Sequence, residues 1–63
     1  MKNLIAKTLK GIGFWASIQP QGVLVGFSRP MSRMEIEETL NREFDVEFKL
    51  EPINEKWLIV VEE

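Results

Sequence analysis

The sequence contains no cysteine and no histidine. Without cysteine there is no disulfide and no thiolate nucleophile, and without histidine the usual general base and the commonest zinc ligand are missing. The serines at positions 17, 28 and 32 lie in no nucleophile elbow and in no Ser-x-x-Lys pattern. We therefore expect a protein that is not an enzyme and that binds no cofactor, metal or small-molecule substrate.

Carboxylates are abundant enough that a catalytic or cation-binding pair has to be considered. The candidates are Glu35, Glu38, Asp45, Glu47 and Glu51. The glutamates share a helical segment with Arg42, and the later acids alternate with Lys49, which is the pattern of solvated surfaces. No loop rich in Asp and Asn with a central glycine, as calcium sites use, is present. The acids therefore favour surface roles.

Acidic residues are absent from the first half of the chain. Residues 35–63 contain all ten acids, whereas five of the eight basic residues lie within residues 1–34: Lys2, Lys7, Lys10, Arg29 and Arg33. The formal net charge of −2 hides this division. Such asymmetry either marks separate interaction surfaces or is cancelled when the halves fold together, and for a small domain we favour cancellation.

The chain also lacks a long hydrophobic run. Residues 11–28 are uncharged, but polar residues and glycines interrupt them, so we expect no membrane span. Lys7 and Lys10 break the apolar region that a signal peptide needs, and the lack of cysteine fits a reducing compartment, so we expect a cytoplasmic protein. A 63-residue domain without disulfide or zinc needs good packing or oligomerisation, so a homodimer is one expectation.

The first residues have the spacing of an amphipathic helix. A stripe at intervals of three and four residues is formed by Met1, Leu4, Ile5, Thr8, Leu9 and Ile12. Gly11 suits the left-handed residue that often ends a helix. We predict a short basic helix over residues 2–10, either packed on the domain or free to dock on a partner.

A β-hairpin is predicted next, from strand-forming residues 13–19 and 23–28. They flank Gln19-Pro20-Gln21-Gly22, in which Pro and Gly fit their preferred turn positions. Gly26 inside the second strand predicts a bulge or a point where another backbone comes close.

The segment before the main helix carries two overlapping capping signals. Ser32 and Glu35 are spaced as a capping box, and Met31 and Ile36 as a hydrophobic staple, so we predict a helix over residues 33–44. Its apolar stripe consists of Ile36, Leu40 and Phe44, with Met34 nearby. An anion could bind between Arg29 and Arg33 at this helix start, but the capping box uses the free N–H groups, so we favour the structural role.

A second hairpin is predicted at the end of the chain. Residues 45–51 alternate cleanly, with Val46, Phe48 and Leu50 expected to face inward from an edge strand. A turn is expected over residues 52–55. The continuous apolar run of residues 56–62 predicts a central strand covered on both faces.

These elements predict an α+β fold in a single domain over residues 1–63. A short N-terminal helix precedes a ββαββ body, whose four strands form a mostly antiparallel sheet with one main helix packed on it. Both sheet faces carry apolar residues. The helix at 33–44 covers one face, and either the N-terminal helix, through Leu4, Ile5 and Leu9, or a partner covers the other.

Because both sheet faces carry apolar residues, we predict a small non-catalytic interaction module or regulator, for example an inhibitor of a larger protein. Its expected partner is a larger target protein or a second copy of the chain. Its expected contact surface is an apolar sheet face with an acidic rim, which would attract a basic surface of the partner. The expected contact residues are Phe14, Trp15, Leu24, Phe27 and Trp57, since aromatics are favoured interface anchors.

The alternative is a weak nucleic-acid-binding protein. It would use the basic residues of the first half (Lys2, Lys7, Lys10, Arg29 and Arg33) near Phe14 and Trp15, because basic side chains hold phosphates and aromatic rings stack on bases. The sequence pI of about 5.1 is far from the basic footprint of such proteins. We therefore place it second.

Overall fold

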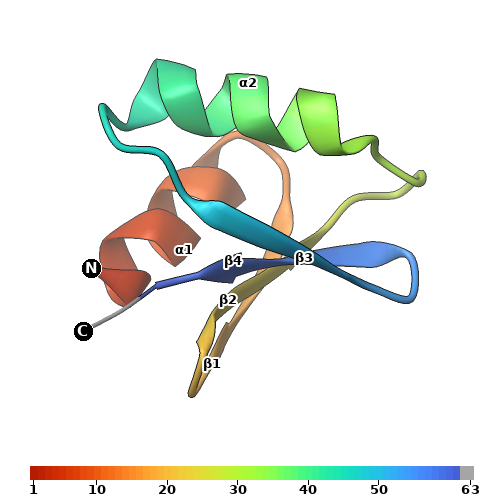
Figure 1. The fold of residues 1–63 in the computed structure, drawn as a ribbon, viewed down its shortest axis with the longest axis horizontal. Coiled ribbons are helices and arrows are strands. Elements are labelled where there is room, and N and C mark those ends of the chain that lie inside the picture. The colour runs from red at the N-terminus through yellow and green to blue at the C-terminus, as the bar shows by residue number, and fades with distance from the viewer. Residues whose placement is uncertain (62–63) are drawn as a thin grey trace.

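The fold combines two helices with one antiparallel sheet (Figure 1). The computed structural model describes residues 1–61. Its elements are α1 (Lys2–Gly11), β1 (Trp15–Gln19), β2 (Gly22–Gly26), α2 (Arg33–Glu43), β3 (Lys49–Ile53) and β4 (Lys56–Val60). The strand order is β1-β2-β4-β3, with every neighbouring pair antiparallel. This confirms the predicted α+β class, and it places β1 and β3 at the edges.

Both helices cover the same face of the sheet, and in Figure 1 α2 lies above β3. One hydrophobic core joins α1, α2 and the strands: Ile5, Ala6, Leu9, Ala16, Val23, Val25, Ile36, Leu40, Leu50, Ile59 and Val61. We considered that either α1 or a partner covers the second face of the sheet, and α1 therefore does not cover it. As predicted, β4 lies inside the sheet, and its residues from Trp57 to Val60 are buried or half-buried on both faces, although helices cover only one of these faces.

Helix α1 is one residue longer than predicted and ends differently. Gly11 is its last residue, Ile12 is the C-cap with φ −97°, and the left-handed position is Gly13, with φ 106°. The Phe14 N–H donates to the Leu9 carbonyl at 3.0 Å, which turns the chain back towards the sheet. The first strand therefore starts at Trp15 instead of residue 13.

The first hairpin turns at Pro20 and Gln21, within the predicted Gln19–Gly22 segment, and β2 runs without a bulge at Gly26. The glycine that the backbone requires is Gly22. A Cβ there would overlap the Ile59 carbonyl oxygen and lie 2.9 Å from the Val61 nitrogen. Strand β4 packs against β2 this closely only because position 22 has no side chain.

Helix α2 starts with the predicted capping box. The Glu35 N–H donates to Ser32 Oγ at 3.3 Å, and the Ser32 N–H donates to Glu35 Oε2 at 3.2 Å. Ile36 and Leu40 are buried as predicted, but Met34 is 69% exposed. Met34 lies two residues before Ile36, so its side chain leaves the helix on the solvent side.

The second hairpin lies later in the chain than predicted. Strand β3 starts at Lys49, and Val46, which was predicted to face inward, is 49% exposed. The two-residue turn is Asn54–Glu55, where Asn54 has φ 55°, so Pro52 belongs to the strand. Asparagine tolerates this left-handed conformation, and an edge strand tolerates proline, because an outward-facing position needs no N–H. The predicted edge position of this strand is confirmed.

Candidate interaction surface

The strand register divides the sheet residues between two faces, because side chains alternate along each strand. The face without helices, hereafter the open face, carries three residues from each strand: Trp15, Ser17 and Gln19 of β1, Gly22, Leu24 and Gly26 of β2, Lys56, Leu58 and Val60 of β4, and Lys49, Glu51 and Ile53 of β3. None of them belongs to the core formed with the helices.

The middle of the open face is apolar. Leu24 of β2 pairs directly with Leu58 of β4, and their row continues to Ser17 on one edge and Glu51 on the other. Leu58 is only 3% exposed although no helix covers it, and Leu24 is half-buried. An interior strand position is thus sheltered by its neighbours on both sides, whereas an edge position is not.

Trp15 is the largest side chain on the open face. It is 51% exposed, and the Lys56 ammonium lies 5.4 Å from the centre of its ring. Trp15 and Lys56 are on β1 and β4, so the lysine side chain reaches across β2. It crosses at Gly26, where a Cβ would come within 3.2 Å of Lys56 Cγ. Gly26 therefore provides the space in which the lysine stem lies flat and its charge reaches the indole ring.

The polar residues of the open face lie along its edges and carry both signs of charge. Gln19 Nε2 donates to Ser17 Oγ at 3.0 Å on β1. Glu51 and Lys49 are exposed on β3, and Lys56 lies between the edges. The border of this face is thus mixed in sign where the sequence led us to expect an acidic rim.

The five predicted interaction residues do not share one surface. Trp15 and Leu24 lie on the open face. Phe14 and Phe27 contact each other with ring centres 5.5 Å apart, and Phe14 packs against the core. Trp57 also packs against the core, and its Nε1 donates to the Met31 carbonyl at 2.8 Å.

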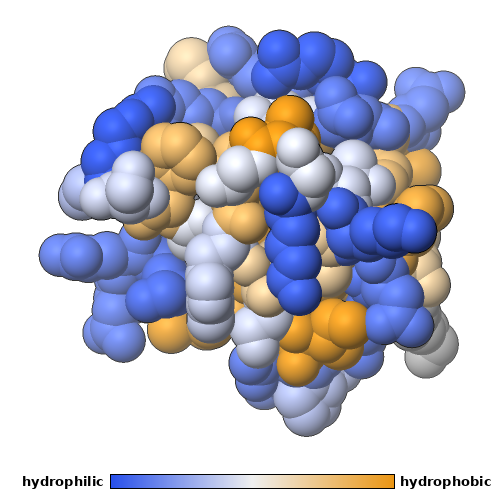
Figure 2. Space-filling model, turned by 180° about the vertical axis from the view of Figure 1, so that it is seen from behind, coloured by the Kyte–Doolittle hydropathy of each residue, from blue (hydrophilic) through white to orange (hydrophobic). Residues whose placement is uncertain are grey.

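Sequence reasoning missed the remaining open-face residues, among them Ile53, Lys56 and Leu58. Alternation along each strand could have grouped them only after the register between strands was known. Exposure alone would not have found them either, because large exposed apolar residues occur in every part of the chain, from Met1 and Leu4 to Val46 and Ile53. In Figure 2 the hydrophobic residues likewise form separate groups divided by hydrophilic ones.

Three of the five basic residues predicted for nucleic-acid binding are engaged within the chain. Arg29 donates to both carboxylate oxygens of Glu35, at 3.2 and 3.3 Å, and Arg33 Nε donates to Glu37 at 2.9 Å. Lys2 donates to the Pro20 carbonyl at 2.8 Å. Lys7 and Lys10 are exposed on α1 and form no ion pair with any residue between 1 and 61.

The arginine at the start of α2 also sets the electrostatics of the cap. The hydrogen bond from Arg29 holds the pKa of Glu35 below its ordinary value, and the Ser32 backbone N–H acts in the same direction. Both ion pairs are largely exposed, so each contributes little to stability. Their main effect is to direct two arginine charges towards the protein's own glutamates.

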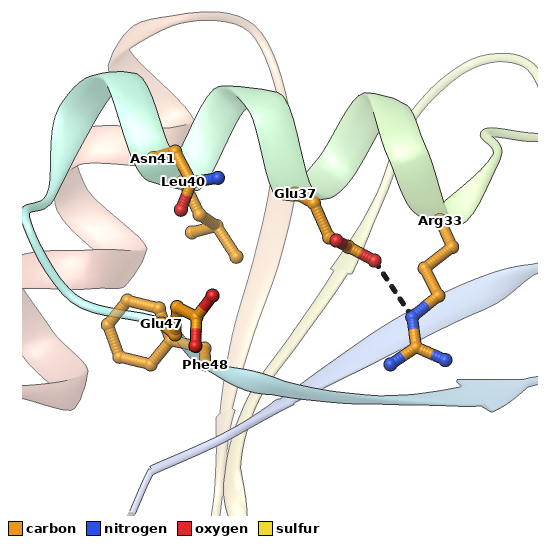
Figure 3. Close-up of a pocket in the computed structure, with 6 residues that line it drawn as sticks. All are labelled: Arg33, Glu37, Leu40, Asn41, Glu47 and Phe48. Atoms are coloured by element: carbon orange, nitrogen blue, oxygen red, sulfur yellow. Dashed lines mark hydrogen bonds and ion pairs between the residues drawn. The ribbon is translucent and has the colours of Figure 1, made fainter.

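A shallow recess between α2 and the start of β3 was a further candidate (Figure 3). Its volume is 190 Å³, and its lining residues are Arg33, Glu37, Leu40, Asn41, Glu47 and Phe48. Figure 3 shows the Arg33–Glu37 pair at one end and Glu47 with Phe48 at the other. The recess is smaller than usual ligand pockets, which start near 300 Å³, and its one cation is already paired.

A second recess, of 340 Å³, lies beside Met1 and the ends of β3 and β4 and has a mostly apolar lining.

Within residues 1–61 no cluster of three or more acidic, histidine or cysteine side chains could hold a metal ion. Neither helix in this part of the chain has the length and apolar character needed to cross a bilayer.

No protein-family model, curated protein or solved structure matches the chain. Its function must therefore be argued from the open face and the charges around it.

Proposed function

We propose that this protein is a small non-catalytic interaction module that binds another protein through its open face. The observation that carries the proposal is the open face itself, where a half-exposed tryptophan borders a leucine pair on the sheet face that no helix covers. Trp15 and Leu24 provide apolar contact area, and aromatic side chains are enriched at protein interfaces.

The edges of this face supply the polar contacts that such an interface needs. Ser17, Gln19 and Glu51 can donate or accept hydrogen bonds around the apolar centre, and Lys49 adds a charge. An apolar centre with a polar border is the usual anatomy of a protein-binding surface. A module of this kind acts by occupying a surface of its partner, which is how small regulators and inhibitors work.

We place this function ahead of nucleic-acid binding because of the arginines. Arg29 and Arg33 pair with Glu35 and Glu37, and each paired charge is less available to phosphate. Lys7 and Lys10 alone provide too few contacts for more than weak, salt-sensitive binding.

Site-specific photo-crosslinking tests the proposal. The photoreactive residue p-benzoylphenylalanine is placed at position 15 or, as a matched control, at position 18, and the protein is irradiated in lysate of its source cells. Trp15 and Ile18 lie on the same strand and are almost equally exposed, at 51% and 50%, but they lie on opposite faces. We expect protein adducts from position 15 and few from position 18. Equal yields at the two positions would contradict binding through the open face.

A further inference from the structure

We propose that the partner of the open face is a second copy of this chain, packed face to face about a two-fold axis that runs parallel to the strands. The inference rests on the proposed function and deepens it by naming the partner. It is carried by the pattern of residues on the open face, which is complementary to itself under this one symmetry operation.

The two-fold axis runs parallel to the strands and lies between β2 and β4. Rotation about it gives a second copy whose residues keep their positions along the strand direction, while the order of its strands across the sheet is reversed. Strand β1 then faces β3 of the second copy, and β2 faces β4. Because two sheets that pack face to face keep their strands within about 30° of each other, this correspondence survives the sheet twist. Each row of the open face thus meets the same row of the second copy in reverse order.

The apolar residues meet apolar residues in this arrangement. Trp15, 51% exposed on β1, faces Ile53 of the second copy, 40% exposed on β3. Leu24 faces Leu58 of the second copy, and the symmetry repeats both contacts. Each edge strand leaves one apolar side chain half-exposed on this face, and in the dimer these two side chains cover each other.

The polar residues meet groups that can satisfy them. The Ser17 hydroxyl faces the Glu51 carboxylate of the second copy, to which it can donate, and the Gln19 amide oxygen faces the Lys49 ammonium, from which it can accept. Lys56 lies flat over Gly26 with its ammonium over Trp15, so the two Lys56 charges lie on opposite sides of the axis. No residue on the face meets a like charge.

Charge selects this axis over the other two-fold axis that lies between the faces. An axis perpendicular to the strands would place each strand on itself, with its direction along the strand reversed. Glu51 would then face Glu51 of the second copy, and Lys49 would face Ile53. Like charges held against each other and a lysine set against an apolar residue both oppose association.

The size of the face sets the expected strength. Four strands about 4.8 Å apart and five residues of about 3.4 Å give a flat footprint of roughly 300 Å² per copy. Even allowing for a corrugated surface, this lies below the ~800 Å² per partner of a standard interface. We therefore expect a dimer that dissociates in the micromolar range, about 10–100 µM.

A charge exchange tests both the partner and the axis. In the Ser17→Glu variant each new carboxylate faces Glu51 of the second copy, and the dissociation constant should rise at least about tenfold. Adding Glu51→Lys should return it to within about threefold of the original. Within one chain these two positions lie on opposite edges, three strand spacings or about 14 Å apart, so a rescue reports contact between copies.

The measurement is sedimentation equilibrium from about 1 µM to about 1 mM, with circular dichroism to verify that each variant is folded. Ile18→Arg is the control, because it adds a charge to β1 on the opposite face, and it should leave the dissociation constant unchanged. A chain that is monomeric at the highest concentration, a Ser17→Glu variant that dimerises normally, or a double variant without rescue would each overturn the proposal.

The crosslinking experiment separates this failure from failure of the proposed function. Adducts from position 15 to a different protein, with a monomeric chain, would overturn the second copy as partner but keep the open face as a binding surface. A monomeric chain without selective adducts at position 15 would overturn both.

Discussion

The two faces of the sheet are built from alternate residues of the same strands, yet they are covered in different ways. On β1, Ala16 is 6% exposed beneath the helices, whereas its neighbour Trp15 is 51% exposed on the open face. On β4 the difference nearly disappears, since Ile59 is fully buried and Leu58 is 3% exposed. A helix thus buries the strand residues directly beneath it, such as Ala16, although Ile18 on the same face and strand remains 50% exposed. On the open face only the interior strands are buried. The apolar side chains that remain exposed on the open face are consequently those of the edge strands, Trp15 and Ile53.

The largest effect is expected from Gly22, where the backbones of β2 and β4 are closest. In Gly22→Ala the new methyl group overlaps the Ile59 carbonyl, so the strands must separate, and the free energy of unfolding should fall by more than about 3 kcal/mol. Gly26→Ala is the matched control at the other end of β2, because its methyl group meets only the flexible Lys56 stem and should cost under about 1 kcal/mol. Urea unfolding measures both, and equal losses would contradict this account of Gly22.

The comparison of the faces is tested directly at two consecutive residues of β4. Ile59→Ala leaves a cavity beneath the helices and should cost about 3–4 kcal/mol. Leu58→Ala leaves a depression that water can enter, so the loss should be nearer about 2 kcal/mol. Urea unfolding at low protein concentration gives both values without a contribution from dimers. A Leu58→Ala loss as large as that of Ile59→Ala would mean that the open face is sealed as tightly as the helical one.

The smallest expected effect is on acid stability and concerns the N-terminal cap of α2, one of the two helices that cover the sheet. Because the pKa of Glu35 is lowered in the folded state, its ionised form adds stability above its ordinary pKa near 4.5. That contribution is lost as the pH falls through the lowered value. In Glu35→Gln, whose side chain can still accept the cap hydrogen bond, the difference in thermal unfolding midpoint between neutral pH and about pH 3 should be smaller than in the parent. An unchanged difference would show that this ion pair has no effect on acid stability.

Local signals in the sequence were enough to predict the start of α2 and the turn of the first hairpin. The capping box at Ser32 depends on residues three apart, and the turn before Gly22 on residues next to each other. The start of β3 was harder to predict from sequence, because the alternation of apolar and polar residues begins at residue 45, whereas the strand begins only at Lys49. Alternation shows which residues could share a face, but only pairing with β4 shows where the strand begins.

The composition of the open face could not be predicted for a different reason. Leu4, Ile5 and Leu9 form a stripe that suits either face of the sheet, and nothing local decides which one α1 covers. Trp15 and Trp57 look equivalent in sequence, but the register places them on opposite faces. Long-range pairing therefore decided which predicted interaction residues lie together.

Pro52 in β3 has a consequence for how the sheet can grow. A strand that carries proline offers a broken row of hydrogen-bond donors, and Lys49 and Glu51 add charge to the same edge. The opposite edge, β1, has the sequence WASIQ, with neither charge nor proline. A fibre requires two adhesive edges on each molecule, and this sheet has one. Edge-to-edge association of crowded copies should therefore stop at pairs instead of continuing into fibrils.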